Sequence, residues 1–328
     1  MSAGISILDY LHFDNPTIEQ KNALIAMSDF VKEDNKDDFL ILCGAAGTGK
    51  TSITSALIGY LNQSATQYRI AAPTGRAARI LGRKTNAQNS TIHSMIYNAD
   101  ANPETGIVKF ILKHAESEDF CVFIVDEASM INAVTSTQEN SLFIASDSLL
   151  NDLVKYIKSG NKRNKLLLLG DRNQLPPVNE KDSYALMPDF LTTKYGWNGN
   201  FHLLTEVKRQ EDGSYILKNA TNISNAIGKG LTQYNVEAPY YAFQYAVNKY
   251  VEDYKNLPAD SCISIGCTHN SNQYFNDMVR TRLYGDKPPL IIAGDLMLVT
   301  QKWSRNGQEL FNGDHVVVEE ILLNQIDT

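Results

Sequence analysis

The residues with the clearest chemistry form a glycine-rich segment, GAAGTGKT, at residues 44–51. An apolar run typical of a buried strand precedes it and helical spacing follows it, which is the setting of a phosphate-binding loop. Glycines let the backbone wrap around phosphate oxygens, so that its N–H groups point toward them. Lys50 is then expected to hold the β- and γ-phosphates of a nucleotide, and the Thr51 hydroxyl to bind Mg²⁺. The residues predicted to contact the nucleotide in this loop are Gly44, Ala45, Ala46, Gly47, Thr48, Gly49, Lys50 and Thr51.

Two acidic residues end a second apolar run, in the segment FIVDEAS at residues 123–129. In a parallel sheet, the carboxyl end of a buried strand lies at the crevice where ligands bind. Asp126 is expected to hold Mg²⁺, and Glu127 to orient or deprotonate an attacking water molecule. The alternative is that a carboxylate caps a helix N-terminus, which is common after strands.

A third polar turn follows the apolar run at residues 165–170, where the sequence continues DRNQLPPV. The pattern places Gln174 near the end of a strand beside the phosphate site, where its amide could sense the γ-phosphate. By itself this turn is weak evidence for a phosphate site, because polar turns after strands are common.

The elements that must position these side chains alternate between apolar strands and helices. This order predicts an α/β fold, the doubly wound parallel sheet of a P-loop NTPase with helices on both faces. Short continuous apolar runs are typical of strands buried on both sides. Thr17 and Gln20 form a capping-box pattern at the start of a helix over residues 17–31. The other predictions are strands at residues 39–43, 69–72, 121–125 and 165–170, and helices at 50–61 and 75–81.

Two domains are expected, residues 1–202 and 203–328. Turn chemistry at residues 98–106, followed by partial alternation, predicts a β-hairpin inserted at about residues 97–118. In the second domain the patterns predict helices at residues 215–227, 242–254 and 273–284, and strands at 262–268, 296–300 and 315–321. A complete doubly wound domain needs more strands than these, so we expect an incomplete second domain.

Composition restricts the class of protein. Of the 328 residues, 43% are hydrophobic and 20% charged, which is typical of globular domains. The sequence has no apolar run of about 18 residues and no secretory signal, so we expect no membrane association and a cytoplasmic protein. The four cysteines lie singly, without metal-binding spacing, which favours a reducing compartment. A net charge of −7 argues against coating of nucleic acid by the whole surface, but it allows binding in a locally basic cleft.

Taken together, these segments resemble the superfamily 1 helicases that move 5′ to 3′, in particular the RecD-like and Dda-like group. The matching segments, in chain order, are TIEQ, GAAGTGKT, AAPTGRAA, STIHSM, VDEASM, LGDRNQLPPV and LTEVKRQ. The resemblance implies two RecA-like domains around ATP and Mg²⁺, and a monomer whose partners are single-stranded DNA and duplex junctions. It implies an ATP hydrolase that moves on DNA and unwinds it in replication, recombination or repair.

The resemblance assigns two further residues to the nucleotide. Gln20 matches the glutamine that reads adenine, a role compatible with its place in the capping box. Arg209 matches an arginine that the second domain supplies to the γ-phosphate, where a planar cation neutralises transition-state charge when the domains close. The plain alternative is that Lys208 and Arg209 are a solvated surface pair. The catalytic residues predicted in this way are Lys50, Glu127, Gln174 and Arg209.

The resemblance also implies DNA contacts in both domains. The hairpin matches the family's pin, which separates the duplex, and its aromatic residue is placed to stack on a base. Residues 312–314 match the turn before an inserted barrel-like subdomain, with a hairpin turn as the alternative. The residues predicted to contact DNA are Thr74, Arg76, His93, Phe110, Thr268 and Asn270. The alternatives are a structural role at a helix start for His93 and packing of the hairpin against the first domain for Phe110.

The sequence departs from the family at its last two motifs, a T-x-H-K-x-Q-G core and a V-x-x-T-R-x-R segment, which it lacks. We therefore expect a C-terminally truncated helicase or a degenerate relative. Two other classes stay open: a DNA-stimulated ATPase or nucleotide-dependent DNA-binding module that does not unwind, and a P-loop kinase. The kinase reading requires an acceptor-binding lid and gives residues 169–178 no role.

Overall fold

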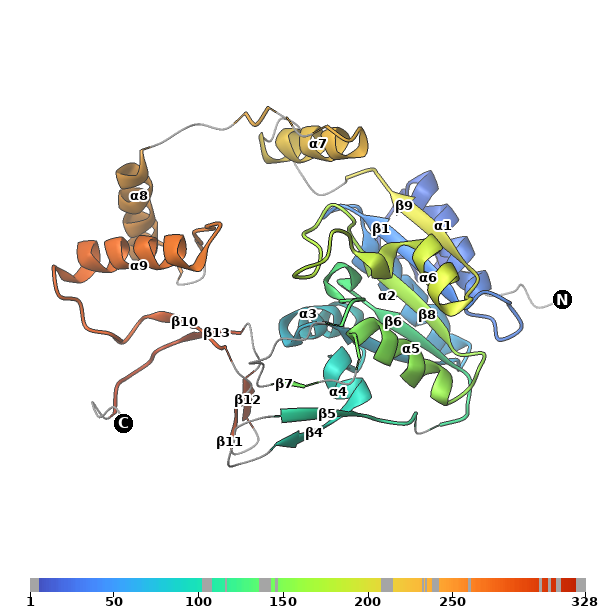
Figure 1. Cartoon of the computed structure of the whole chain (residues 1–328). Helices are drawn as coiled ribbons and strands as arrows, with labels where there is room; N and C mark the ends of the chain where they lie inside the picture. Colours follow the sequence, from blue (N-terminus) through green and yellow to red (C-terminus); the bar gives the residue numbers. More distant parts are fainter. Residues whose placement is uncertain are drawn as a thin grey trace. The chain divides into compact units, whose positions relative to one another are not determined.

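A six-stranded sheet organises the first part of the chain in the computed structural model (Figure 1). Its strands pair in parallel, in the order β3-β2-β6-β8-β1-β9. The strands are β1 Phe39–Gly44, β2 Gln67–Ala72, β3 Asn89–Thr91, β6 Cys121–Val125, β8 Lys165–Gly170 and β9 Gly199–Leu204. All four strands predicted for this sheet form, so the α/β prediction is confirmed.

The structure describes most of the chain, and the statements below concern that part. The described residues are 6–101, 108–115, 117–135, 143–144, 147–207, 215–231, 233, 235–237, 242–258, 261–300, 303–305, 308–310 and 314–322.

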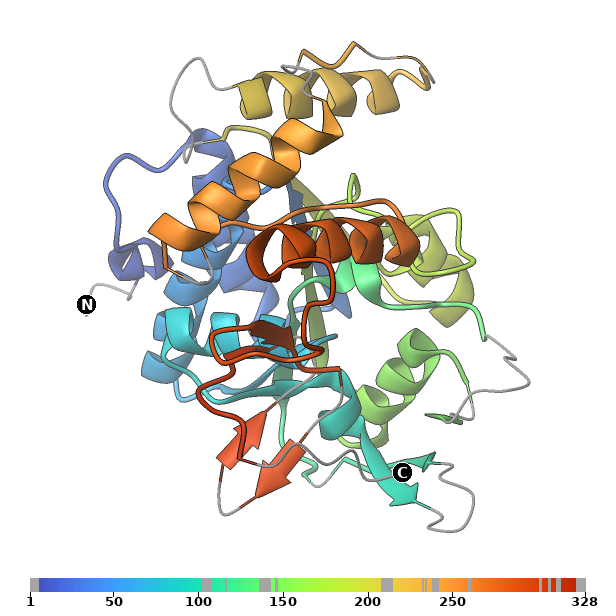
Figure 2. The same ribbon diagram turned by 90° about the vertical axis from the view of Figure 1, so that its left-hand side faces the viewer.

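Helices cover both faces of the six-stranded sheet (Figure 2). Successive residues of β1 therefore enter two different apolar cores: Phe39 and Ile41 lie in one, and Leu40 and Leu42 in the other. The first core includes side chains of α4, α5 and α6, and the second includes side chains of α1, α2 and α3. Burial on both sides explains why these strands appear in the sequence as continuous apolar runs.

The helices of this part lie close to their predicted positions. Helix α1, Ile18–Phe30, begins with the predicted capping box, since the Thr17 hydroxyl accepts the Gln20 N–H and the Gln20 side chain accepts the Thr17 N–H. The others are α2 Lys50–Gln63, α3 Gly75–Thr85, α4 Ile92–Ile96, α5 Leu149–Ser159, α6 Pro188–Tyr195 and α7 Tyr215–Gly228, with 3₁₀ turns at Ile7–Tyr10, Ala128–Met130 and Tyr184–Leu186. Among the described residues, no helix is long and apolar enough to cross a membrane.

The predicted hairpin insertion is confirmed. Strands β4, Tyr97–Ala101, and β5, Val108–Leu112, pair antiparallel with Tyr97 opposite Leu112. A short strand, β7 Phe143–Ile144, adds to β5 in parallel. The sequence does not reveal β7, because two residues carry no periodicity.

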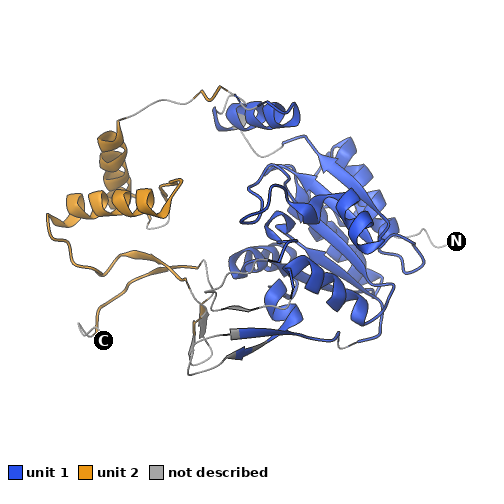
Figure 3. Ribbon diagram, in the orientation of Figure 1, with its two compact units in different colours: residues 1–234 blue, residues 235–328 orange. Residues whose placement is uncertain are grey.

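The chain divides into two compact units, residues 1–234 and 235–328 (Figure 3). The predicted domain boundary, between residues 202 and 203, falls inside β9, which pairs with β1 as far as Leu204. Helix α7, which the sequence places in the second domain, belongs to the first unit.

In its described residues, the second unit contains two helices and two small sheets. Helices α8, Phe243–Asn256, and α9, His269–Tyr284, pack through Val247, Phe275 and Val279. Arg280 donates to both carboxylate oxygens of the buried Asp295, at 2.9 and 2.8 Å. The strands are β10 Leu296–Leu298, paired with β13 His315–Val317, and β11 Trp303–Arg305, paired with β12 Gln308–Leu310.

The predicted strand at residues 262–268 is wrong. Residues 262–266 have no regular secondary structure, and Thr268 caps α9. Apolar alternation produces a strand only where a neighbour accepts its backbone hydrogen bonds, and no described strand pairs with this segment. Ile263 and Ile265 are consequently 72% and 91% exposed. The described strand pairs of this unit are antiparallel, so a second RecA-like sheet stays a prediction.

Candidate nucleotide-binding site

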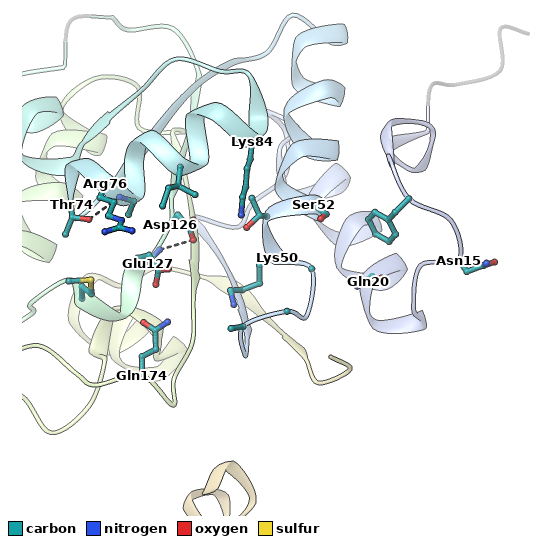
Figure 4. A pocket seen from close by; sticks show the side chains of 18 of the residues that line it. Asn15, Gln20, Lys50, Ser52, Thr74, Arg76, Lys84, Asp126, Glu127 and Gln174 are labelled. Carbon is teal, nitrogen blue, oxygen red and sulfur yellow. Dashed lines mark hydrogen bonds between the residues drawn. The ribbon is translucent and has the colours of Figure 1, made fainter. Parts of the chain in front are cut away.

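A pocket of about 900 Å³ lies where β1, β2, β6 and β8 reach their carboxyl ends (Figure 4). In an open parallel sheet this edge is where ligands bind. Many of the residues predicted from the sequence meet here. Those that line the pocket are Gln20, Ala46, Gly47, Gly49, Lys50, Thr51, Thr74, Arg76, Asp126, Glu127 and Gln174.

The phosphate loop connects β1 to α2, and its conformation requires a glycine at position 49. Gly49 has a φ of +94°, which favours glycine, and a Cβ there would lie 2.7 Å from the Gln20 Nε2. The Lys50 ammonium donates to the carbonyl oxygens of Gly44 and Ala45. A bound phosphate would therefore exchange these two carbonyl partners for charged oxygens, which are stronger acceptors.

Gln20 links the first turn of α1 to the phosphate loop. Its Oε1 accepts the Thr17 N–H and its Nε2 donates to the Thr48 carbonyl, both at 2.9 Å. The side chain is 3% exposed, yet it lines the pocket. A carboxamide has two N–H groups and two acceptor lone pairs, so each end keeps capacity for one further bond. The capping role is confirmed, and the reading of adenine stays a prediction.

Asp126 and Glu127 both reach the pocket because the chain turns sharply after β6. Glu127 has a φ of +52°, an unusual conformation for a residue with a Cβ. The Asp126 carboxylate accepts the Glu127 N–H at 2.9 Å. Glu127 stands before a 3₁₀ turn without a side-chain capping bond, so it does not play the helix-cap role considered as the alternative.

Burial raises the pKa of Asp126, and the positive charges of Lys50 and Lys84 oppose this rise. A buried carboxylate is disfavoured unless a cation compensates it. Asp126 and the Thr51 hydroxyl line the same pocket, and both are oxygen ligands of the type that Mg²⁺ prefers. The residues present therefore fit the metal ion that the resemblance implies.

Gln174 lies across the pocket on the loop after β8. Its Oε1 accepts the Ser129 hydroxyl at 2.9 Å, which joins this loop to the one that carries the acidic pair. Three further bonds join the same loops: the Ser183 hydroxyl donates to the Ser129 carbonyl at 3.2 Å, and Glu180 accepts the N–H groups of Ala133 and Val134. The glutamine and the acidic pair are thus held in one framework.

Helix α3 forms the wall of the pocket opposite the phosphate loop. Thr74 caps this helix by accepting the Ala77 N–H at 3.2 Å, and Arg76, Ile80 and Lys84 follow at intervals of four residues along one face. Thr74 and Arg76, predicted to contact DNA, therefore lie beside the nucleotide pocket, and their DNA contact stays a prediction. The sequence analysis missed Lys84, although the four-residue spacing was a signal for it.

The loop before α1 closes another side of the pocket. Phe13, Asp14 and Asn15 line it together with Gln20. Phe13 is half-buried, and Asn15 has a φ of +53°. The sequence analysis missed these residues because a loop has no periodicity; the only signal is an aromatic residue shortly before a strongly capped helix.

His93 and Phe110 belong to an aromatic cluster at the base of the hairpin. The ring centroids of Phe110 and Tyr97 lie 5.2 Å apart in a stacked arrangement, and the His93 ring lies 5.4 Å from Phe110. Burial lowers the pKa of His93. Packing of the hairpin against the first unit, considered as the alternative for Phe110, is therefore present; stacking on a base stays a prediction.

The remaining predicted residues belong to the second unit or lie outside the described residues. In the second unit, Thr268 caps α9 by accepting the Ser271 N–H at 3.1 Å, and Asn270 follows it as an exposed residue. Arg209 lies outside the described residues, as do residues 312 and 313 of the predicted turn. Asp314 is buried.

Comparison with known proteins agrees with a P-loop nucleotide-binding site. A family model described as an AAA domain matches residues 28–180, which include the phosphate loop, the acidic pair and Gln174. The parallel sheet and the phosphate loop therefore have a RecA-like P-loop α/β fold.

The chain is 30% identical over 217 residues to the ATP-dependent DNA helicase dda of Enterobacteria phage T4, covering 65% of this chain and 43% of the relative. It is 32% identical over 139 residues to the ATP-dependent RecD2 DNA helicase of Deinococcus radiodurans, covering 42% of this chain and 16% of the relative. The chain thus spans less than half the length of these relatives. A crystal structure of the Pif1 helicase from Candida albicans matches 81% of this chain and 61% of its own, with 17% identity and a TM-score of 0.42. The resemblance to superfamily 1 helicases of the RecD and Dda type is confirmed.

Proposed function

We propose that this protein is an ATP-dependent DNA helicase or translocase that moves 5′ to 3′ on single-stranded DNA and unwinds duplexes. One observation carries the proposal: Lys50 and Thr51 line the same pocket as Asp126, Glu127 and Gln174. These are the groups that phosphoryl transfer to water needs, namely a phosphate clamp, a metal ligand, a base and a sensor.

In this proposal each residue has one task. When bound, ATP and Mg²⁺ supply the reactive γ-phosphate and the charge that stabilises it. Lys50 holds the β- and γ-phosphates, while Thr51 and Asp126 hold the metal. Glu127 orients and deprotonates the attacking water. Gln174 contacts the γ-phosphate and reports its loss through Ser129.

The second part of the proposal explains how the protein moves along DNA. Arg209 contacts the γ-phosphate and neutralises charge in the transition state. Two groups of residues hold the DNA backbone in turn, which makes binding independent of base sequence and sensitive to salt. The proposed DNA-contacting groups are Thr74, Arg76, His93 and Phe110 in the first unit, and Thr268 and Asn270 in the second. Such a motor serves replication, recombination or repair.

A second candidate function is a DNA-stimulated ATPase that does not unwind. The exposure of Ile263 and Ile265 favours it, because the segment expected to be a buried strand of the second sheet is unpaired here.

Phosphate release measured with and without single-stranded DNA tests the proposal, with Lys50→Ala as the negative control. Displacement of a labelled strand from duplexes with a 5′ or a 3′ tail then separates the two candidates and gives the direction. DNA-stimulated turnover together with displacement from the 5′ tail supports the helicase. Stimulation without displacement selects the second candidate, and turnover that DNA does not change contradicts both.

A further inference from the structure

Two adjacent side chains in the first turn of α1 have different partners. Gln20 donates to the Thr48 carbonyl of the phosphate loop at 2.9 Å. Glu19 accepts both the backbone N–H and the hydroxyl of Thr205, each at 2.6 Å, and lies 3.5 Å from the Glu206 N–H. One helical turn therefore joins the phosphate loop to the chain that leaves β9.

The phosphate loop and the segment after β9 also leave the sheet side by side. Gly44 pairs with Leu204 in the register of β1 and β9. A Cβ added to Gly44 would lie 2.9 Å from the Leu204 carbonyl oxygen, so the two backbones are in close approach. At such distances a displacement of one backbone is transmitted to the other, because packed interiors have little free space.

Glu19 is suited to hold this segment at neutral pH. The hydrogen bond from the Thr205 hydroxyl, followed by that from its N–H, lowers the pKa of Glu19. The carboxylate is thus ionised, and charged acceptors form the stronger hydrogen bonds. Its place in the first turn of α1 adds a favourable interaction with the helix N-terminus.

We propose that Glu19 is a positioning residue for the segment that leads to Arg209, four residues beyond Thr205. By holding Thr205, it fixes the start of that segment relative to the phosphate loop. The inference rests on the proposed function, which gives Arg209 its role at the γ-phosphate.

A second hydrogen bond holds the chain that follows Arg209 in the sequence. Asn173, the neighbour of Gln174, donates to the Ser224 hydroxyl on α7 at 2.8 Å. Elements of the nucleotide site thus hold the chain both before and after residues 208–214.

Amide hydrogen exchange tests the anchor without any need for catalysis. We expect Glu19→Ala to speed exchange of the Thr205 and Glu206 amides by about tenfold, the size of effect that loss of a charged hydrogen bond produces. The matched control is Glu33→Ala, which removes a surface carboxylate bound to Arg163 at 2.6 Å and should leave exchange at these amides unchanged. Equal exchange in wild type and Glu19→Ala would overturn the proposal.

Kinetics test whether the anchor acts through Arg209. We expect Glu19→Ala to lower kcat for ATP hydrolysis by about tenfold while KM for ATP changes less than about twofold, because Lys50 and Gln20 keep their contacts. In an Arg209→Lys background, which retains charge but loses the planar fork, Glu19→Ala should have no further effect.

An equal fall of kcat in both backgrounds, or a rise of KM alone, would show that Glu19 acts independently of Arg209 and would overturn the proposal. Failure of the proposed function has a different signature, since it appears as unchanged phosphate release in Lys50→Ala and leaves the exchange result valid.

Discussion

The side chains of the nucleotide pocket already have protein partners that resemble what a nucleotide offers. Lys50 is bonded to two loop carbonyls, and Gln20 is bonded to Thr17 and Thr48. Such bonds hold the side chains in place before any ligand arrives, so little rotamer entropy is lost on binding. We therefore expect individual side chains to decide the affinity for nucleotide and the rate of hydrolysis.

Replacing Lys50 tests the phosphate clamp. We expect Lys50→Ala to lower the rate of ATP hydrolysis by about 100-fold or more, because one charged donor to the transferring group is lost. Steady-state phosphate release measures this, with the exposed Lys36→Ala as the control. Wild-type turnover in Lys50→Ala would refute the assignment of the phosphate loop.

Replacing Gln20 tests its contact with the loop. In Gln20→Glu, the carboxylate can still accept the Thr17 N–H, but it has no hydrogen to donate to the Thr48 carbonyl and faces it as a second acceptor. We expect nucleotide affinity to fall by about tenfold, and more than in Gln20→Ala. Titration with a fluorescent nucleotide measures the affinity, and Gln63→Glu, at the exposed end of α2, is the matched control. Equal affinity in Gln20→Glu and wild type would contradict this account.

The strands of the parallel sheet bring the loops that follow them to one edge of the sheet. Hydrogen bonds then join these loops to one another. The loop after β6 and the loop after β8 are joined by Ser129 with Gln174 and by Glu180 with two backbone N–H groups. The hairpin is anchored in the same manner, because the Tyr97 hydroxyl donates to the buried Asp152 at 2.7 Å. An anchored hairpin can resist a load, which a strand-separating role requires.

Removing the Tyr97 hydroxyl should loosen the hairpin. We expect Tyr97→Phe to lower the free energy of unfolding by about 1–3 kcal/mol, because the buried Asp152 carboxylate loses the hydrogen bond from the Tyr97 hydroxyl. Urea denaturation measures the change. Tyr68→Phe removes a comparable hydroxyl bond to Asn62, at 2.9 Å on the surface, and should cost less. Equal losses in the two variants would argue against a special role for the buried bond.

At the scale of the molecule, the first unit contains a buried lysine far from the nucleotide pocket. Lys165, at the opposite end of β8 from the pocket, is 2% exposed and donates to the carbonyls of Asn35 and Asp37. Its ammonium also lies 5.1 Å from the centre of the Phe30 ring. Burial nevertheless lowers the pKa of Lys165 to about 8.

This lysine predicts a pH dependence of stability. Between pH 8 and 10.5 the unfolded chain holds the Lys165 proton more tightly than the native protein does. The free energy of unfolding therefore increases as pH rises through this range. We expect wild type to gain on the order of 1–2 kcal/mol relative to Lys165→Met across it. Urea denaturation of both proteins at several pH values measures the difference. Curves that stay parallel would contradict the prediction.

The sequence by itself determined the parallel sheet, the phosphate loop and the acidic pair. These depend on local patterns: apolar runs of strand length, glycines where the backbone must approach an anion, and capping residues such as Thr17. Only the tertiary structure decided which distant groups meet. It brought Phe13 to the pocket and joined Glu19 to Thr205, since these two contacts have no sequence spacing. It also left residues 262–266 without a paired strand among the described residues, because a strand exists only when another strand accepts its hydrogen bonds.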